Sequence, residues 1–396
     1  MTELRDVSVL LGNSKHILNI SSFQENETEH YRVANNSKKH HLGSTMPDLS
    51  FDSAMHKVNI YGVPLIVVVG IITNILAYAV FTKSYLRKVA LIPYLAGIAV
   101  SDSGFLFTFF LSFLTYNHEL PLLNQVGLCQ FGTFANFVFL FLSKWYLVAM
   151  MVEKFISVFW PSKKSSMCTS FRAKAVLISL AVLAIVCYSY MIYFFGPQTN
   201  KFTGHRYCNP WQEFHKHFSN LMFVDAFIVS VVPLLVTLVL LSLIIIHGCT
   251  CCRESYAFDN VCRRHDKSKQ AKETMFISKL LFPLVALDFV CQLPLSVLRI
   301  IGLFNRVGQK DLIPKVQLVV HLIHLQFFAC KFFSYVCFSK NFRAGLSDVV
   351  LNVSKVLSRR FHRTTFSGNE IEESDLQSAS ANLQISTSLH FTQSSV

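Results

Sequence analysis

The chain has 396 residues, of which 52% are hydrophobic and 15% are charged. A soluble globular protein of this length cannot bury so much apolar surface, so the composition excludes most soluble classes and indicates membrane-spanning segments. The formal net charge of +13 does not indicate a nucleic-acid partner, because the basic residues cluster in short loops beside apolar runs, as they do in membrane proteins.

Residues 1–57 form a polar N-terminal segment. They lack the basic and then apolar start of a cleavable signal peptide, so the first apolar run is expected to insert as its own signal. Asn19, Asn26 and Asn35 each begin an Asn-x-Ser/Thr glycosylation sequence. Their clustering favours an extracellular, glycosylated and disordered tail, with a plain polar tail as the alternative.

Seven apolar segments follow this tail, and each approaches or exceeds the roughly 20 residues that a helix needs to cross the hydrocarbon core. The segments are Ile60–Phe81, Leu91–Leu114, Phe131–Val152, Ala175–Phe195, Leu221–Ile246, Met275–Leu303 and Leu312–Phe338. Lys and Arg predominate after the first, third, fifth and seventh segments, which predicts cytoplasmic loops there and an extracellular N-terminus. The sequence therefore predicts an all-α membrane protein, a multi-pass seven-transmembrane helix bundle.

The expected domain organisation has three parts. Residues 1–57 are the extracellular tail, and residues 58–346 are the seven-helix domain, which ends in a short amphipathic helix after the seventh span. Residues 347–396 turn to Ser, Thr, Asn and Gln beyond Phe366, which is typical of a disordered tail, here on the cytoplasmic side.

Four ionisable residues interrupt the apolar segments. Asp102, Lys144, Asp288 and Lys331 fall in the second, third, sixth and seventh segments respectively. An ionisable group at mid-bilayer costs about 2.5–3.5 kcal/mol on insertion scales, so such groups usually face the bundle interior and find partners. Two acids and two bases therefore predict internal ion pairs.

Several short motifs occur in a fixed order along these segments. They are Asn74, Leu95–Asp102, Cys129, Glu153-Lys154-Phe155, Pro233, Cys291–Pro294 and Lys331–Tyr335. Their order and spacing resemble those of the rhodopsin-like, or class A, G-protein-coupled receptors over roughly Tyr61 to Arg343. The resemblance implies a plasma-membrane receptor that binds an extracellular ligand between its helices and signals to a heterotrimeric G protein. It implies no enzymatic activity, no cofactor and no metal.

The resemblance also implies roles for individual residues. The expected sites are the disulfide Cys129–Cys208, the ligand pocket Asp225, Gln292 and Arg299, and the G-protein face Glu153, Lys154 and Tyr335. Asp225 and Arg299 are opposite charges near the outer ends of neighbouring spans. A third internal ion pair is therefore the alternative to their contact with a ligand.

The family positions of these four charged residues predict two ion pairs. Asp102, Ser143 and Lys331 match a small polar pocket that holds a sodium ion in the family. Here the Lys331 ammonium is expected to replace that ion and bind Asp102, or else to reach the inner interface with its long stem. Lys144 and Asp288 match the connector between ligand pocket and helix movement, which predicts a salt bridge between them.

Departures from the family pattern leave rival functions open. Lys154 replaces an arginine, and because lysine lacks the planar five-donor guanidinium, a seven-helix receptor that binds ligand without activating G proteins is the first rival. The second rival is a membrane hydrolase that would hold zinc through His321 and His324, but it lacks a third convincing ligand. Residues 145–150 and 167–169 resemble invertebrate neuropeptide receptors, so a peptide ligand is expected.

Overall fold

The computed structural model describes residues 55, 57–117, 120, 122–199, 206–257, 281–298, 312–352 and 354–355. The proposed glycosylation sites Asn19, Asn26 and Asn35, and the proposed pocket residue Arg299, lie outside these ranges. The chain divides into two compact units, Met1–Arg343 and Ala344–Val396. The helix bundle and its sites belong to the first unit.

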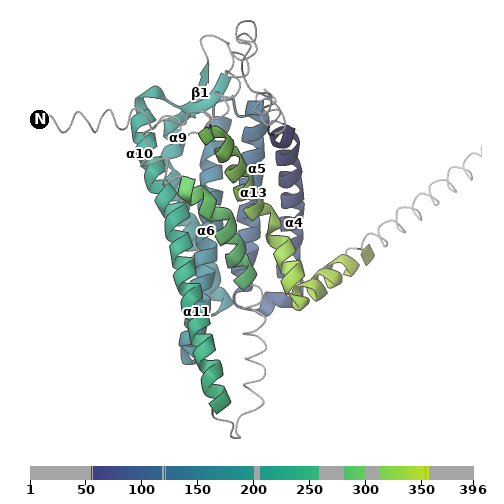
Figure 1. Ribbon diagram of the computed structural model, residues 1–396. Helices are drawn as coiled ribbons and strands as arrows, with labels where there is room; N and C mark the ends of the chain where they lie inside the picture. The colour runs from purple at the N-terminus through teal and green to yellow at the C-terminus, as the bar shows by residue number, and fades with distance from the viewer. Residues whose placement is uncertain are drawn as a thin grey trace, which may run out of the picture. The chain divides into compact units, whose positions relative to one another are not determined.

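Seven helices among the described residues are long and apolar enough to cross a membrane, which confirms the predicted all-α seven-helix bundle (Figure 1). Their bounds are α4 (Val63–Lys83), α5 (Ile92–Asn117), α6 (Leu128–Phe159), α8 (Ser170–Tyr188) with α9 (Tyr190–Phe194), α10 (His215–Ala226) with α11 (Val232–Ala257), the helix Leu281–Leu298, and α13 (Leu312–Phe338). Short helical turns join or extend them, namely η2 (Val58–Gly62), η3 (Tyr85–Lys88), η4 (Pro161–Lys163), α7 (Lys164–Met167), η5 (Gln212–Phe214) and η6 (Phe227–Val231). Residues 340–352 form a further helix.

The third helix is longer than the hydropathy of the sequence predicts. α6 runs from Leu128 to Phe159, whereas the apolar segment was expected at Phe131–Val152. Polar residues such as Glu153 and Lys154 do not end a helix, because the backbone hydrogen bonds within it continue beyond the apolar region. Hydropathy therefore marks the membrane-embedded part of this helix and not its ends.

A small antiparallel sheet lies at one end of the bundle, which we call the hairpin end (Figure 1). Strand β1 (Phe195–Thr199) pairs with β2 (Arg206–Pro210), and Pro197 lies opposite Cys208. A disulfide joins Cys208 to Cys129 near the start of α6, as expected from the sequence. The sheet is thereby tied to the third helix, which has the most buried window of the seven spans.

The fifth helix contains a π-helical turn just before a proline. This turn, η6, precedes Pro233, and the backbone N–H of Val232 donates to the carbonyl of Phe227. Proline has no N–H and cannot complete the usual i to i−4 bond. A π turn in that position shifts the hydrogen-bond ladder by one residue and lets the helix continue into α11.

The helices α4, α5 and α13 approach each other closely around Gly70. A Cβ atom placed on this glycine would lie 2.6 Å from Leu106 Cδ1 and 2.9 Å from Ala329 Cβ. One turn further along α4, the Asn74 side chain donates to the backbone carbonyl of Phe328 at 2.9 Å. The first and seventh helices are thus joined by both close packing and a buried hydrogen bond.

Aromatic rings pack at the other end of the bundle, away from the sheet. Phe81 of α4 contacts Tyr335 of α13 and Phe342 with ring centroids 5.3 and 5.4 Å apart. Arg343 donates to the backbone carbonyls of Val336 and Cys337 at 2.7 and 3.1 Å. These carbonyls lie in the last turn of α13, where a cation is favoured by the unpaired backbone acceptors and the helix dipole.

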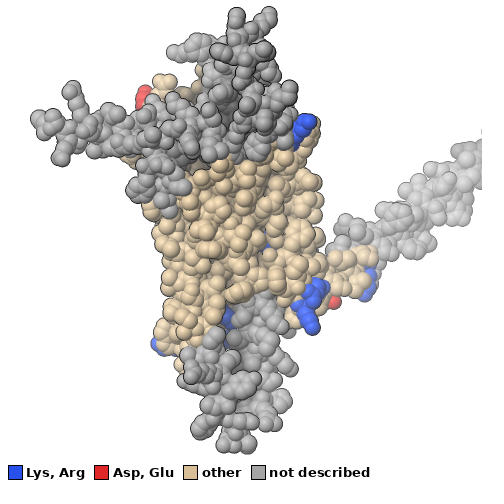
Figure 2. All heavy atoms as spheres, viewed as in Figure 1, with Lys and Arg blue, Asp and Glu red and all other residues tan. Residues whose placement is uncertain are grey.

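Apolar side chains cover the outer surface of the bundle. The middle of the face drawn in Figure 2 is almost entirely free of Lys, Arg, Asp and Glu. Large apolar side chains such as Leu65, Ile178 and Val239 are more than half exposed. An exposed apolar belt of this kind suits contact with lipid and is rare in soluble proteins.

Candidate functional site

Four charged side chains are buried together inside the bundle. The exposed fractions of Asp102, Lys144, Asp288 and Lys331 are 0%, 1%, 2% and 1% respectively. They come from four different helices, α5, α6, Leu281–Leu298 and α13. The two positive and two negative charges sum to zero, which lowers the cost of placing them in an apolar interior.

Asp102 and Lys331 form the more extensively bonded pair. The Lys331 Nζ atom lies 2.9 and 2.7 Å from the two carboxylate oxygens of Asp102 and 3.2 Å from Ser143 Oγ. Ser143 in turn donates to Asp102 Oδ1 at 2.5 Å. All three N–H donors of the ammonium therefore have acceptors, and Lys331 does not extend to the end of the bundle.

Lys144 and Asp288 form the second pair through a single hydrogen bond of 3.2 Å between Nζ and Oδ1. The structure thus brings together both pairs of residues that were predicted from the sequence to form ion pairs. Phe327 was missed by sequence reasoning. Its ring centroid lies 3.3 Å from the Nζ atom of Lys144 and 3.8 Å from that of Lys331, so one aromatic ring contacts both ammonium groups.

The sequence partly indicated an aromatic ring near Lys331. Phe327 and Lys331 are four residues apart on α13, and side chains with this spacing lie on the same helix face. Nothing in the linear sequence indicates that Lys144, on a different helix, reaches the same ring. Cation–π contacts of this kind contribute about 2 kcal/mol or more where both groups are desolvated.

Two buried polar atoms in the helix Leu281–Leu298, beyond Asp288, lack partners in the part of the chain that the structure describes. Gln292 and Ser296 are 2% and 3% exposed, and Gln292 Oε1 and Ser296 Oγ have no hydrogen-bond partner among the described residues. The two residues are four positions apart and lie on the same helix face. Leaving such a buried group unpaired costs about 1–3 kcal/mol, so a hydrogen bond from a further polar group would stabilise this face.

Asp225 is buried in α10 and accepts a hydrogen bond from the Tyr188 hydroxyl of α8. The sequence placed this carboxylate in a ligand pocket or in an ion pair with Arg299. The contact with Tyr188 was in neither expectation, because an uncharged partner leaves no signature in the charge pattern. The Tyr188 ring also packs on Phe137 and Phe141 of α6, so this contact joins three spans.

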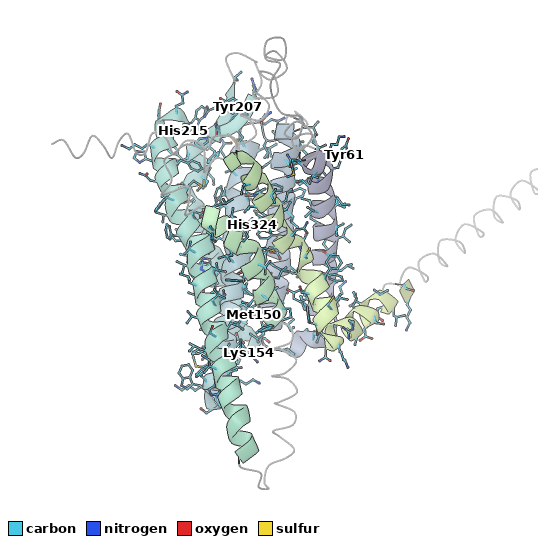
Figure 3. All side chains as sticks on the ribbon, viewed as in Figure 1. Tyr61, Met150, Lys154, Tyr207, His215 and His324 are labelled. Carbon is cyan, nitrogen blue, oxygen red and sulfur yellow. A yellow bond between two sulfur atoms is a disulfide. The ribbon has the colours of Figure 1, made fainter. Side chains whose placement is uncertain are left out.

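Lys154 lies towards the end of the bundle away from the sheet (Figure 3), and Glu153 precedes it in α6. Both are buried, and Lys154 is only 2% exposed. Glu153 forms a hydrogen bond with Tyr94, while its Oε1 atom has no partner among the described residues. Cys168, between the third and fourth spans, contacts the backbone carbonyl of Glu153 at 3.7 Å, and burial raises the pKa of its thiol.

The two histidines of α13 pack against aromatic rings. The His321 ring lies 5.4 Å from that of Phe109, and the His324 ring lies 5.2 Å from that of Phe328. Within the described parts of the chain, no group of three or more His, Cys, Asp or Glu side chains is placed to hold a metal ion. The histidines therefore give the zinc-hydrolase rival no support.

Comparison with known proteins gives a family match and several distant relatives. The family model described as 7 transmembrane receptor (rhodopsin family) matches residues 73–336. Cysteinyl leukotriene receptor 1 of Homo sapiens is 26% identical over 184 residues, which are 46% of this chain and 54% of that protein. The Sus scrofa protein of the same name is 26% identical over 183 residues, again 46% and 54%. The Cavia porcellus protein is 29% identical over 122 residues, or 31% and 36%.

The family match and the matches to individual relatives cover different lengths of the chain. The family match begins within α4 and ends within α13, so it includes parts of the first and seventh spans and everything between them. The chain spans about half the length, or less, of the curated relatives it matches. The matches support a receptor and not an enzyme, and they give no support to the neuropeptide subgroup.

Proposed function

The chain belongs to the rhodopsin family of seven-transmembrane receptors, and from this premise we propose that it is a cell-surface receptor that couples an extracellular ligand to a heterotrimeric G protein. The observation that carries the proposal is the family match over residues 73–336, which extends from the first to the seventh span. The ligand binds in the half of the bundle nearer the sheet, and the G protein binds at the end that bears Lys154.

The proposed orientation places the hairpin end outside the cell. The disulfide between Cys129 and Cys208 lies at that end, and disulfides form and persist in oxidising, extracellular compartments. Tyr61, just before α4, lies at the same end as Tyr207 (Figure 3). An extracellular N-terminus follows from this placement and agrees with the excess of Lys and Arg in the loops of the opposite side.

Gln292 and Ser296 are the proposed polar contacts of the ligand. The carbonyl oxygen of Gln292 accepts hydrogen bonds, and the Ser296 hydroxyl both donates and accepts. A ligand that donates an N–H or O–H group would therefore satisfy both residues and remove the cost of leaving them unpaired. Asp225 contributes indirectly, because its hydrogen bond to Tyr188 fixes the positions of the fourth and fifth spans.

We propose a ligand that carries an amide or amino group. A peptide, as predicted from the sequence, supplies such groups along its backbone. The relatives are by name receptors for cysteinyl leukotrienes, and a cysteinyl group also carries an amino-acid portion. Both ligand classes thus fit the acceptor of Gln292, and the neuropeptide subgroup is not required for either.

The proposed G-protein face consists of Glu153, Lys154 and Tyr335. All three side chains are buried in this conformation, so a G protein would reach them only after the helices separate at that end. Lys154 keeps the positive charge of the family arginine but has no planar fork of donors. This replacement also motivates the second candidate, a receptor that binds ligand without activating G proteins.

Nucleotide exchange by purified G proteins tests the proposal. The full-length receptor in lipid nanodiscs would be exposed to a peptide library and, separately, to cysteinyl leukotrienes, and GTPγS binding to a panel of heterotrimers would be measured. A ligand-stimulated rise in exchange is expected, and it should be reduced by Gln292→Leu, which removes the proposed acceptor while keeping the side-chain size. Saturable ligand binding without exchange by any heterotrimer would instead support the second candidate.

A further inference from the structure

The two ion pairs of the buried cluster are held with very different numbers of contacts. Lys331 has three acceptors, from Asp102 and Ser143. From the residues that the structure describes, Asp288 accepts one hydrogen bond, donated by Lys144 at 3.2 Å. Among the described residues this bond is the single polar side-chain contact between the helix Leu281–Leu298 and the rest of the bundle. Within the described parts of the chain, the polar cluster therefore joins α5, α6 and α13 through several hydrogen bonds and reaches the helix Leu281–Leu298 through one.

Lys144 keeps other stabilising contacts if Asp288 moves away. Its ammonium lies 3.3 Å from the centroid of Phe327 on α13, and the nearby carboxylate of Asp102 interacts with it electrostatically. An ammonium over an aromatic face is attracted by the ring quadrupole, and most strongly where water is excluded. Separation of the pair thus leaves Lys144 with a partial substitute partner, which an isolated buried ion pair would lack.

We propose that the Lys144–Asp288 contact is a latch that holds the helix Leu281–Leu298 against α6, and that Phe327 retains Lys144 in place while the latch is open. The latch concerns a movement of one helix and can be tested without any G protein. Its expected consequence for signalling rests on the proposed receptor function. The two closing experiments below therefore separate a failure of the latch from a failure of that function.

The first experiment measures the distance between the two helices. Spin labels carried on an unnatural amino acid at positions 152 and 282, where Val152 and Phe282 are exposed, would report on α6 and on the helix Leu281–Leu298. The full-length receptor in nanodiscs is expected to give one short distance. Asp288→Asn removes the charge but keeps a hydrogen-bond acceptor, and a second, longer population is expected. Val290→Ala, at an exposed position of the same helix, is the control and should retain the single short distance.

A second variant keeps this test decisive if Asp288→Asn fails to fold. Replacing both partners, as Lys144→Met with Asp288→Leu, leaves no unpaired buried charge, so folding is expected to be retained. The polar joint is absent, and the longer distance should appear here too. A wild-type distance distribution in either folded variant would overturn the latch.

The second experiment tests the role of Phe327 against a matched neighbour. Phe328 is equally buried, but its ring centroid lies 4.9 Å from Lys144 Nζ. Phe327→Leu combined with Asp288→Asn should lose most of the folded receptor, because Lys144 then has neither its charged partner nor the ring. Phe328→Leu combined with Asp288→Asn should yield as much folded receptor as Asp288→Asn alone. Equal yields from the two combinations would show that Phe327 does not retain Lys144.

Basal nucleotide exchange on the same samples gives the signalling readout. A several-fold rise is expected in Asp288→Asn wherever the longer distance appears. A longer distance without any exchange would leave the latch supported while contradicting the proposed G-protein coupling. An unchanged distance with normal ligand-stimulated exchange would contradict the latch alone.

Discussion

At the residue scale, the main feature of this protein is a set of charges where a bilayer normally excludes them. Asp102, Lys144, Asp288 and Lys331 are buried together and paired. Each pair must balance the desolvation of two ions, so removing one partner costs far more than removing both. This difference separates a true buried pair from two charges that are merely close.

The pairing of Lys144 with Asp288 predicts a non-additive mutant cycle. Lys144→Met and Asp288→Leu should each destabilise the fold by roughly 3–5 kcal/mol, whereas the double variant should be close to the wild type, because no charge is left unpaired. Thermal unfolding of the purified receptor and surface expression would measure the effect. Additive losses in the double variant would contradict pairing. A charge-reversed pair is a poorer test, because a carboxylate at position 144 would face the ring of Phe327.

The position of the Lys331 ammonium predicts a receptor that does not respond to sodium. Its Nζ atom lies between the oxygens of Asp102 and Ser143, where the family is expected to hold the ion. Replacing sodium chloride with choline chloride should leave the thermal unfolding midpoint of the wild type unchanged. Lys331→Asn frees the carboxylate and should make the midpoint increase with sodium. Sodium dependence in the unmodified protein would falsify the prediction.

At the element scale, two kinds of contact decide how the helices pack. Because Gly70 has no side chain, α4 packs so closely against α5 and α13 that a single added methyl group would clash with both. The hydrogen bond of Asn74 to the Phe328 carbonyl fixes the register of α4 on α13. The disulfide between Cys129 and Cys208 ties the sheet to α6, and the two cysteines are 79 positions apart in the sequence. Closing a loop of that length restricts the unfolded chain strongly and stabilises the fold.

Adding one methyl group at Gly70 should separate these helices. Gly70→Ala places a Cβ atom 2.9 Å from Ala329 Cβ, and overpacking of this kind costs about 1–3 kcal/mol. Gly62→Ala is the matched control, because its Cβ would meet Val58 Cγ1 at an ordinary 3.6 Å. Unfolding midpoints of the two variants should differ, with only Gly70→Ala lowered. A normal midpoint for Gly70→Ala would mean that the helices adjust without cost.

At the scale of the whole molecule, the chain is a multi-pass membrane protein of the rhodopsin family. The exposed apolar belt is the surface suited to contact with lipid. The two ends of the bundle differ in the residues they carry. The sheet and disulfide lie at one end, and buried Glu153 and Lys154 lie near the other. The proposed direction of signalling follows from this difference between the ends.

The proposed orientation predicts that the N-terminal tail is glycosylated in cells. Enzymatic removal of N-linked glycans from the surface receptor should increase its mobility on a gel, because Asn19, Asn26 and Asn35 would lie outside. Replacing all three with Gln should abolish this shift, and Asn59→Gln, which is outside any such sequence, should not. An unchanged mobility of the wild type, together with antibody access to its N-terminus only after permeabilisation, would contradict the orientation.

The sequence alone determined the class of protein, the seven spans and the need of the charges within them for partners. Apolar runs of membrane length can be read directly, because the bilayer imposes their length, and lone charges within them must pair. The disulfide followed from a resemblance to a family and was then found between Cys129 and Cys208.

Only the tertiary structure decided which neighbours the charges acquire. The contact of Lys144 with Phe327 and the hydrogen bond between Tyr188 and Asp225 depend on side chains from different helices. So does the absence, among the described residues, of a partner for Gln292 Oε1. Hydropathy and charge patterns describe each helix separately, and they contain no information on how one helix is rotated against the next. That rotation is set by close packing at points such as Gly70, and it places one aromatic ring against two ammonium groups.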